Sequence, residues 1–441
     1  MSSKGRIDLP KGGTPVRTQR GLVSIIWRGT GALLTLLIFS SLTRGATWVV
    51  DPSGAGDFLA IAPALAAAGN GDSVLVVPGV YTGNQNKNLD FGGRGIALLA
   101  IGGADLTVID GQGSGRAFHF HSGEPPSAIV GGFRITRAPT GSPVRIAAGS
   151  RPTIRDCVIE DNHVTSGPGG GVAIIASAPA FVRCAIVQNS SSAHGGGVYI
   201  EGGAPVFIDC FVVGNRTEGR GGGFWVNNGA NLSLSRCTVT ANQADQSDAG
   251  FNGGGIILTG GSTASLQASI LWGNRASNGD DAFIDGTSTL QAECSVVDVS
   301  GLQGPGGFEP GPHISQVEPH FCLPSYNFEQ PWTDGDYTLG ANSPCLPGNN
   351  PCGVRIGAAG ADCGDIAVWT GAAGTTAWEN PFNWAGQALP GPDDHVQLTR
   401  GNVVLSSEAA IALLTQVPET RKVSIPASGT FLVSGGSLQV G

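Results

Sequence analysis

The sequence predicts an all-β fold in which short strands coil into a parallel β-solenoid, and three observations predict it. Cysteines stand 26 or 27 positions apart through the middle of the chain, and glycine triplets recur at a similar interval. Between these markers apolar and polar residues alternate, as in the segment GGGVYIEGGAPVFIDC at 195–210. Alternation is typical of strands with one buried face, and a period in the mid-twenties suits three short strands per coil. The 71 glycines supply sharp corners.

Two residue types mark the same place in successive coils. Each repeated cysteine is followed five positions later by an asparagine; Ser269 takes the cysteine place in a later copy and Gly132 in an earlier one. We expect ladders of stacked side chains, with the cysteines reduced, because parallel neighbours about 4.8 Å apart lie too far apart for a disulfide. The predicted ladders are Cys157, Cys184, Cys210 and Cys237, and Asn162, Asn189, Asn215, Asn242 and Asn274.

The residues directly before the ladder cysteines alternate in charge. They are Asp156, Arg183, Asp209 and Arg236. Opposite charges on neighbouring coils predict an exposed ladder of ion pairs that sets the register and adds about 0–1 kcal/mol per pair.

These repeats resemble those of right-handed parallel β-helix proteins of the pectin-lyase-like superfamily, and GGGVY with CFVVGN resembles the repeat of polymorphic outer-membrane proteins. The resemblance covers residues 47–365 and implies a right-handed single-stranded parallel β-helix. Residues 47–82 resemble its entry cap, with a strand, a short helix around 58–68 and a buried strand at 74–77. Residues 318–365 resemble its closing segment. The resemblance implies a fold and no single activity, since one fold hosts many functions.

The two ends of the chain differ from the repeats. Residues 1–46 combine a basic stretch, the apolar run GALLTLLIFSSL and small residues at 45–46, which predicts a signal peptide or N-terminal export signal. An uncleaved anchor is the alternative, and both forms would be exported. Residues 366–441 contain Trp369, Trp378 and Trp384 and then alternating strands. We expect a small C-terminal β segment there, the start of a second, truncated β-solenoid.

Charge limits the partners. The formal net charge is −9, and without residues 1–46 the chain has 17 basic and 32 acidic residues. An acidic surface disfavours nucleic acid and anionic membranes. We therefore expect a secreted or cell-surface protein with no nucleic-acid partner and no membrane span in the mature chain.

Four further cysteines gather near the predicted closing segment. In an exported chain they predict two disulfides, and three connectivities remain open. A zinc site is the competing hypothesis, but no CxxC pair or histidine pattern supports it. The four are Cys322, Cys345, Cys352 and Cys363.

An outward column after the glycine triplets contains Tyr199 and Trp225 on adjacent coils. Such a pair predicts an aromatic platform that stacks on sugar rings, with Glu201 and Asn227 as hydrogen-bonding neighbours. The equally weighted alternative is that the rings only pack under a long loop.

A second outward set is apolar and predicts a covered face. It comprises Phe211, Val213, Ile270 and Trp272. We expect the long corner QADQSDAGFN at 243–252 to cover it, and the aspartates of that corner, Asp245 and Asp248, to be candidates for calcium, the one cofactor considered.

Asp280 and Asp281 form the only GDD motif, which resembles the paired carboxylates of β-helix glycosidases. They occupy the glycine-triplet corner of a worn repeat, however, and the companion motifs NTDG, GHG and RIK are absent. A structural role is therefore favoured over catalysis.

The favoured function is an exported, adhesin-like β-helical scaffold that binds glycan or another surface component. The alternative is a polysaccharide lyase or hydrolase that acts on acidic polysaccharide. The two differ in whether acids and a basic residue converge in a cleft.

Overall fold

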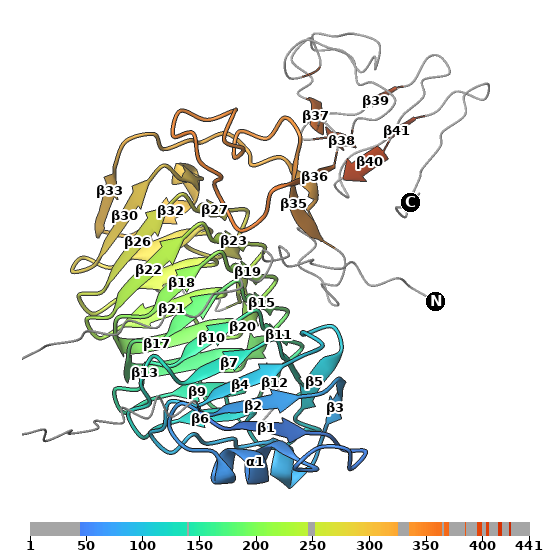
Figure 1. Cartoon of the computed structure of the whole chain (residues 1–441). Coiled ribbons are helices and arrows are strands. Elements are labelled where there is room, and N and C mark those ends of the chain that lie inside the picture. The colour runs from blue at the N-terminus through green and yellow to red at the C-terminus, as the bar shows by residue number, and fades with distance from the viewer. Residues whose placement is uncertain are drawn as a thin grey trace, which may run out of the picture.

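The computed structural model describes residues 45–138, 141–245, 252–324 and 335–363, with a few short strands and Trp384 beyond them. Its strands stack into a long parallel β-helix, with helix α1 (Ile61–Ala67) at the N-terminal end (Figure 1). The export signal predicted at 1–46 falls almost wholly outside these residues. Among the described residues no helix is long and apolar enough to cross a membrane.

Four parallel sheets run along the helix, and neighbouring strands within each sheet come from successive coils. Sheet A contains β1 (Thr47–Val50), β2 (Ser73–Val76), β4 (Ala97–Ala100), β7 (Ile129–Gly131), β10 (Thr153–Arg155), β14 (Ala180–Val182), β18 (Val206–Ile208), β22 (Asn231–Ser235), β26 (Thr263–Gln267), β30 (Thr289–Glu293) and β33 (Gly307–Pro310). Sheet B contains β3 (Gly79–Tyr81), β5 (Thr107–Asp110), β8 (Arg134–Thr136), β11 (Val158–Glu160), β15 (Ala185–Val187), β19 (Phe211–Val213), β23 (Thr238–Thr240), β27 (Ile270–Trp272) and β31 (Val296–Val297).

The other two sheets complete each coil. The short sheet contains β12 (His163–Val164), β16 (Ser190–Ser191), β20 (Arg216–Thr217), β24 (Gln243–Ala244) and β28 (Arg275–Ala276). Sheet C contains β6 (Phe118–Phe120), β9 (Val144–Ile146), β13 (Val172–Ser177), β17 (Val198–Gly203), β21 (Phe224–Asn227), β25 (Ile256–Leu258), β29 (Ala282–Ile284) and β32 (Leu302–Gln303). The predicted three strands per coil are thus joined by a fourth, two-residue strand. Two short 3₁₀ turns lie at Asn84–Asn86 and Val299–Gly301.

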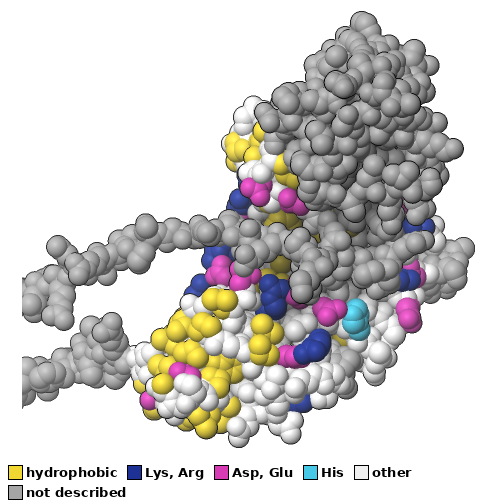
Figure 2. Space-filling view, turned by 90° about the vertical axis from the view of Figure 1, so that its right-hand side faces the viewer, with side chains coloured by type: hydrophobic (Ala, Val, Ile, Leu, Met, Phe, Trp, Pro, Cys, Tyr) yellow, Lys and Arg dark blue, Asp and Glu magenta, His cyan; other side chains and the backbone are white. Residues whose placement is uncertain are grey.

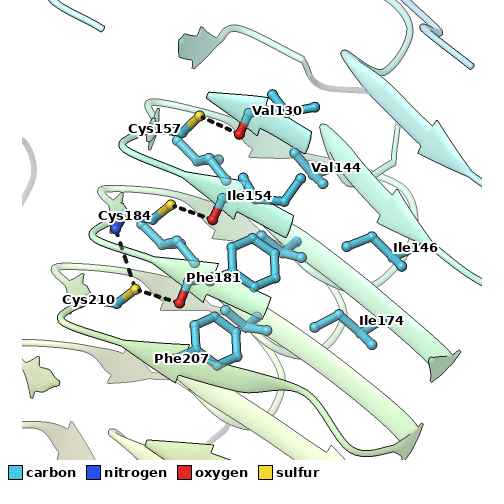
Figure 3. Packing of buried hydrophobic residues seen from close by; sticks show 14 of the residues in the cluster. Val130, Val144, Ile146, Ile154, Cys157, Ile174, Phe181, Cys184, Phe207 and Cys210 are labelled. Atoms are coloured by element: carbon cyan, nitrogen blue, oxygen red, sulfur yellow. Dashed lines mark hydrogen bonds between the residues drawn. The ribbon is translucent and has the colours of Figure 1, made fainter. Parts of the chain in front are cut away.

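The inward side chains form one continuous core, and the predicted cysteine ladder lies inside it (Figure 3). Cys184 donates its thiol to the Ile154 carbonyl at 3.4 Å, and Cys210 donates to the Phe181 carbonyl at 3.5 Å. Burial raises the pKa of both thiols well above the ordinary value, which keeps them neutral. All four ladder cysteines are unpaired and buried, as predicted.

The column of cysteines is continued by other residue types at both ends. Ser269 takes the next place, where its hydroxyl accepts from the Cys237 amide at 3.0 Å, and Ser295 follows. At the other end the prediction for Gly132 was wrong by one residue. Because Val158 pairs with Arg134, Phe133 lies opposite Cys157, and it is fully buried.

The corner between sheets A and B is built from non-glycine residues in the left-handed conformation. Asp156, Arg183, Asp209 and Arg236 have φ values of 54°, 50°, 53° and 50°. This conformation is costly for most side chains. Here the predicted ion pairs hold it: Arg183 bonds Asp156 and Arg236 bonds Asp209, each through Nε at 2.7 Å.

The entry of the β-helix has a cap, and a separate small sheet follows the last coil. At the entry, strand, helix and buried strand appear where the sequence predicts them, as β1, α1 and β2. At the other end a three-stranded sheet follows, formed by β34 (Phe321–Leu323), β35 (Asp336–Gly340) and β36 (Ala361–Cys363). Further along lie β37 (Ile366–Trp369), β38 (His395–Leu398), β39 (Val403–Val404), β40 (Leu413–Gln416) and β41 (Val423–Ser424).

The closing segment lies against the outer face of sheet B and makes a second apolar cluster with it. Phe211 and Ile270 from sheet B are each 1% exposed there, packed with residues such as Phe321 and Leu339. Gly357 donates its amide to the Ala268 carbonyl at 2.8 Å. The predicted cover, the corner at 243–252, is therefore wrong for the described residues; residues 246–251, with Asp248, lie outside them.

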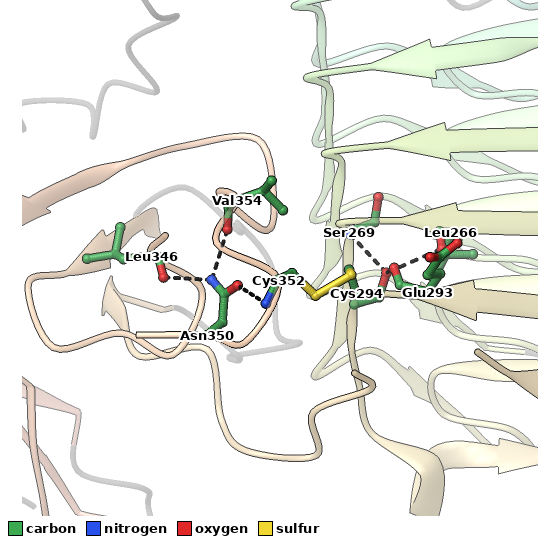
Figure 4. The surroundings of a disulfide bond; sticks show 9 residues. Leu266, Ser269, Glu293, Cys294, Leu346, Asn350, Cys352 and Val354 are labelled. Carbon is green, nitrogen blue, oxygen red and sulfur yellow. Dashed lines mark hydrogen bonds between the residues drawn. A yellow bond between two sulfur atoms is a disulfide. The ribbon is translucent and has the colours of Figure 1, made fainter. Parts of the chain in front are cut away.

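Two disulfides fasten the closing segment, but not with the predicted set of cysteines. Cys322 pairs with Cys363, and Cys352 pairs with Cys294 (Figure 4). Cys345 remains a buried thiol, and burial raises its pKa to about 12. Cys294 is the partner of Cys352 in place of Cys345. Cys294 occupies the left-handed corner, with φ 48°, directly before Ser295. It therefore faces the closing segment instead of the core.

Candidate functional site

The predicted aromatic pair forms, but it is less open than predicted. Tyr199 on β17 and Trp225 on β21 are register partners, and their ring centroids lie 4.5 Å apart. His194 stacks on Trp225 at 5.0 Å. Tyr199 is only 9% exposed, and its hydroxyl donates to Glu201 Oε2 at 2.9 Å. Burial, this hydrogen bond and the carboxylate charge raise the pKa of Tyr199.

The neighbours of this pair already have partners. Asn227 Oδ1 accepts from the Thr259 hydroxyl at 3.0 Å. Ile257, the register partner of Trp225 on the next coil, is fully buried. Trp225 therefore lies between occupied positions on both adjacent coils. It keeps partial exposure, and its buried Nε1 has no hydrogen-bond partner within the described structure.

The four predicted acidic residues do not form one described corner. Asp245 pairs with Arg216, Asp280 Oδ1 accepts from the Ala276 amide at 2.8 Å, and Asp281 is 1% exposed. Asp248 lies outside the described residues. Across the described ranges, no three histidine, cysteine or acidic side chains gather in a geometry that could hold a metal ion.

Asp281 instead ends the asparagine ladder. Each ladder asparagine donates its Nδ2 to the side-chain oxygen of the next one, at 2.9–3.0 Å, from Asn162 to Asn274. Asn274 then donates both its Nδ2, at 2.7 Å, and its backbone amide, at 3.0 Å, to Asp281 Oδ1. The predicted asparagine ladder is thus confirmed, and its last acceptor is a carboxyl group.

The glycine triplets explain why an aspartate fits there. A Cβ on Gly223 would lie 3.1 Å from Nδ2 of Asn242, and one on Gly255 would lie 2.8 Å from Nδ2 of Asn274. The third glycine of a triplet therefore makes room for the asparagine of the next coil. Asp281 holds the equivalent place one coil later, where its carboxyl group takes the position of the next asparagine. This geometry gives the GDD motif a structural role.

An open groove lies on the short sheet, away from all predicted sites except Asp245. It has a volume of about 280 Å³ and crosses β12, β16 and β20. The two-residue strands stack their outward side chains in register, so that His163, Ser190 and Arg216 form one column. The lining residues are His163, Val164, Thr165, Ser190, Ser191, Ser192, Arg216 and Glu218.

Polar side chains within the groove are linked by hydrogen bonds. His163 Nδ1 lies 2.8 Å from Ser190 Oγ, and His163 Nε2 lies 3.0 Å from Asp161 Oδ1. Arg216 pairs with Asp245, which also accepts from Gln243. The groove thus presents a cation, a carboxylate and several hydroxyl groups side by side.

Sequence reasoning missed this groove, although a signal was present. The residue directly after each ladder asparagine is polar in five successive coils: His163, Ser190, Arg216, Gln243 and Arg275. By contrast, the side of the molecule seen in Figure 2 has hydrophobic side chains gathered at its N-terminal end. Among the described residues, the most exposed large apolar side chains are those of Leu59, Val80, Ile101 and Leu106.

Known proteins resemble this chain in its coils. Residues 134–271 match the family model described as "Right handed beta helix region". Similar solved structures include the pectate lyase Pel9A, at 16% identity and a TM-score of 0.37, covering 73% of this chain and 98% of that one. A pectin methylesterase from carrot has 14% identity and a TM-score of 0.27, covering 71% and 95%. A pectin methylesterase from Aspergillus niger has 10% identity and a TM-score of 0.24, covering 66% and 90%.

No curated protein matches the chain. The family match lies within a longer run of coils, from β1 to β33, whose strand pairs are parallel. The central part of the chain, residues 134–271, is a right-handed parallel β-helix.

Proposed function

We propose that this protein is an exported β-helical scaffold that binds polysaccharide in the groove of the short sheet. The observation that supports it is the chemistry of the lining, in which three adjacent coils present hydroxyl, imidazole, guanidinium and carboxylate groups to solvent. Sugars are recognised by such sets of donors and acceptors, and a guanidinium adds affinity for acidic sugars.

One feature supports export, and two others support a scaffold that binds through its outer faces. The described chain contains two disulfides, and such bonds persist in oxidising compartments. The ladder residues are buried and engaged with one another, so they support the scaffold and leave recognition to the outer faces. Trp225, whose ring centroid lies 5.0 Å from that of His194, is partly exposed on the coil that also contains Arg216.

Retention on immobilised polysaccharides tests this proposal. Affinity electrophoresis through acidic and neutral polysaccharides should slow the wild-type chain. Arg216→Ala should reduce that retardation at least fivefold on acidic polysaccharides, and Glu218→Gln should do so on neutral ones. Arg151→Ala, at an exposed corner outside the groove, is the matched control and should migrate like the wild type. Equal migration of all four proteins on every polysaccharide would overturn the proposal.

One observation favours a second candidate, hydrolysis of an acidic polysaccharide or its ester groups. Asp161, His163 and Ser190 form a hydrogen-bonded chain of the kind in which an acid orients a histidine and the histidine activates a hydroxyl. Release of acyl groups or reducing ends by the wild type, abolished in Ser190→Ala with retention unchanged, would support it. Absence of any release would leave binding as the function of the groove.

A further inference from the structure

Asp281 has a buried carboxyl group, and its backbone connects three successive coils near the C-terminal end of the β-helix. Its own carbonyl accepts from the Ile256 amide of the preceding coil at 2.9 Å, and its amide donates to the Gly301 carbonyl of the following coil at 3.0 Å. Its side chain receives both hydrogen bonds from Asn274. A disturbance at this carboxyl group therefore acts on the backbone of the last coils as well as on the ladder.

The surroundings of Asp281 oppose its ionisation. Burial raises the pKa of this carboxyl group to about 7, against the two hydrogen bonds from Asn274, which act to lower it. The charged groups that act on it are the carboxylates of Asp298, beside the 3₁₀ turn at Val299–Gly301, and Asp280, on the same corner; both oppose a further negative charge. The carboxyl group of Asp281 is also tightly packed against Gly301, where an added Cβ would stand 2.9 Å from Asp281 Oδ2.

We propose that Asp281 is a proton-dependent cap of the asparagine ladder, which closes the last coils when it is protonated and loosens them when it is ionised. A charged carboxylate at this place has the two Asn274 donors and must draw in water to complete its solvation. Because the asparagines accept and donate in one direction along the ladder, the loosening begins at its last rung, Asn274.

The loosening would reach the closing segment. The coil that follows Asp281 contains Cys294, and the disulfide to Cys352 joins this coil to the closing segment. Gly301 lies in the same coil, between β31 and β32. Ionisation of Asp281 therefore weakens the support on which the cover of sheet B is anchored, so that cover and ladder respond to pH together.

Hydrogen exchange of the full chain at pH 5.5 and pH 8.5, corrected for the intrinsic exchange rate, tests the proposal. Peptides that contain residues 274–282 and 299–303 should lose at least tenfold protection at the higher pH, whereas peptides from β10 and β14 should keep theirs. Asp281→Asn retains the acceptor and should remove the pH dependence. Asp280→Asn removes one of the two carboxylates that oppose ionisation of Asp281, so it should keep the pH response with its midpoint moved to lower pH.

Asp281→Gly restores the glycine of the triplet and provides a second variant in case the asparagine variant does not fold. It should be less protected than the wild type at pH 5.5 and show no change between the two pH values. Wild-type protection that is independent of pH, or a pH response that persists in both Asp281 variants, would overturn the proposal.

Discussion

The outer faces of sheet B and of the short sheet have the same parallel register but opposite side-chain chemistry. On sheet B, Phe211 and Val213 are 1% and 4% exposed because the closing segment lies over them. On the short sheet, the next strand of the same coil presents Arg216, which lines an open groove. A β-helix thus sets where side chains point, and residue type decides whether a face becomes core or surface.

The difference also concerns how each face is held. The cover of sheet B is fastened by the Cys294–Cys352 disulfide and by Arg355, whose Nη2 lies 2.6 Å from Asp209 Oδ1. The side chains of the groove, by contrast, are held by exposed hydrogen bonds such as that between His163 and Ser190. We expect stability to depend on the first face and binding on the second.

Removal of a closing disulfide should have one of the two largest effects on stability. Replacing Cys294 and Cys352 together by serine opens a loop of 58 residues, and we expect a loss of about 2–4 kcal/mol in the free energy of unfolding. Thermal unfolding with and without a reductant measures it. The wild type in reductant loses both disulfides and should fall at least as far as the variant; an unchanged midpoint in both would contradict the anchoring role.

Truncation of one apolar side chain under the cover should have an effect of comparable size. Phe211→Ala creates a cavity between sheet B and the closing segment, and we expect a loss of about 3–5 kcal/mol if the cover does not collapse into it, and less if it does. Denaturant unfolding provides the value. Ser190→Ala, one coil earlier on the short sheet, is the comparison and should change stability by less than about 0.5 kcal/mol; equal losses would erase the distinction between the faces.

Acid should weaken the cover before it weakens the core. Burial acts to raise the pKa of Asp209, but the hydrogen bond and charge of Arg236, with Arg355 and Arg183, outweigh it and hold the pKa below the ordinary value. Such a carboxylate stabilises the fold above its unfolded pKa, and this stability is lost as pH falls through the folded pKa.

Asp209→Asn should therefore reduce stability at pH 7 and flatten the loss of stability below about pH 4. Thermal midpoints measured between pH 2.5 and 7 reveal both effects. An acid response as steep in the variant as in the wild type would show that other carboxylates dominate.

The smallest effect should come from the groove. Arg216→Ala removes a half-exposed ion pair with Asp245, and such pairs contribute about 0–1 kcal/mol. We expect an unchanged thermal midpoint together with weaker retention on polysaccharide. A large fall in the midpoint would place Arg216 among the residues that support the fold.

Much of the fold follows from the sequence because repetition exposes it. The cysteine and asparagine ladders and the ion pairs at Asp156 and Asp209 appear where the repeats place them. The strand, helix and buried strand of the entry cap appear where the resemblance to β-helix proteins implies them. The disulfide partners could not be predicted in this way. Cys294 points toward the closing segment because it occupies a left-handed corner, and the repeat pattern does not indicate that direction.

The candidate site was harder to predict. Tyr199 and Trp225 meet as expected, but their exposure depends on how tightly neighbouring coils and corners pack around them. The cover of the apolar set around Phe211 comes from more than 100 residues further along the chain, beyond the reach of local patterns. The groove depends on two-residue strands that were not expected as a separate sheet.

A hydrogen-exchange footprint of the chain bound to a retaining polysaccharide tests the central claim most directly. The account predicts new protection in peptides covering 163–165, 190–192 and 216–218, with little change on sheet A. Protection confined to other surfaces, such as the exposed apolar residues around Val80 and Leu106, would contradict it.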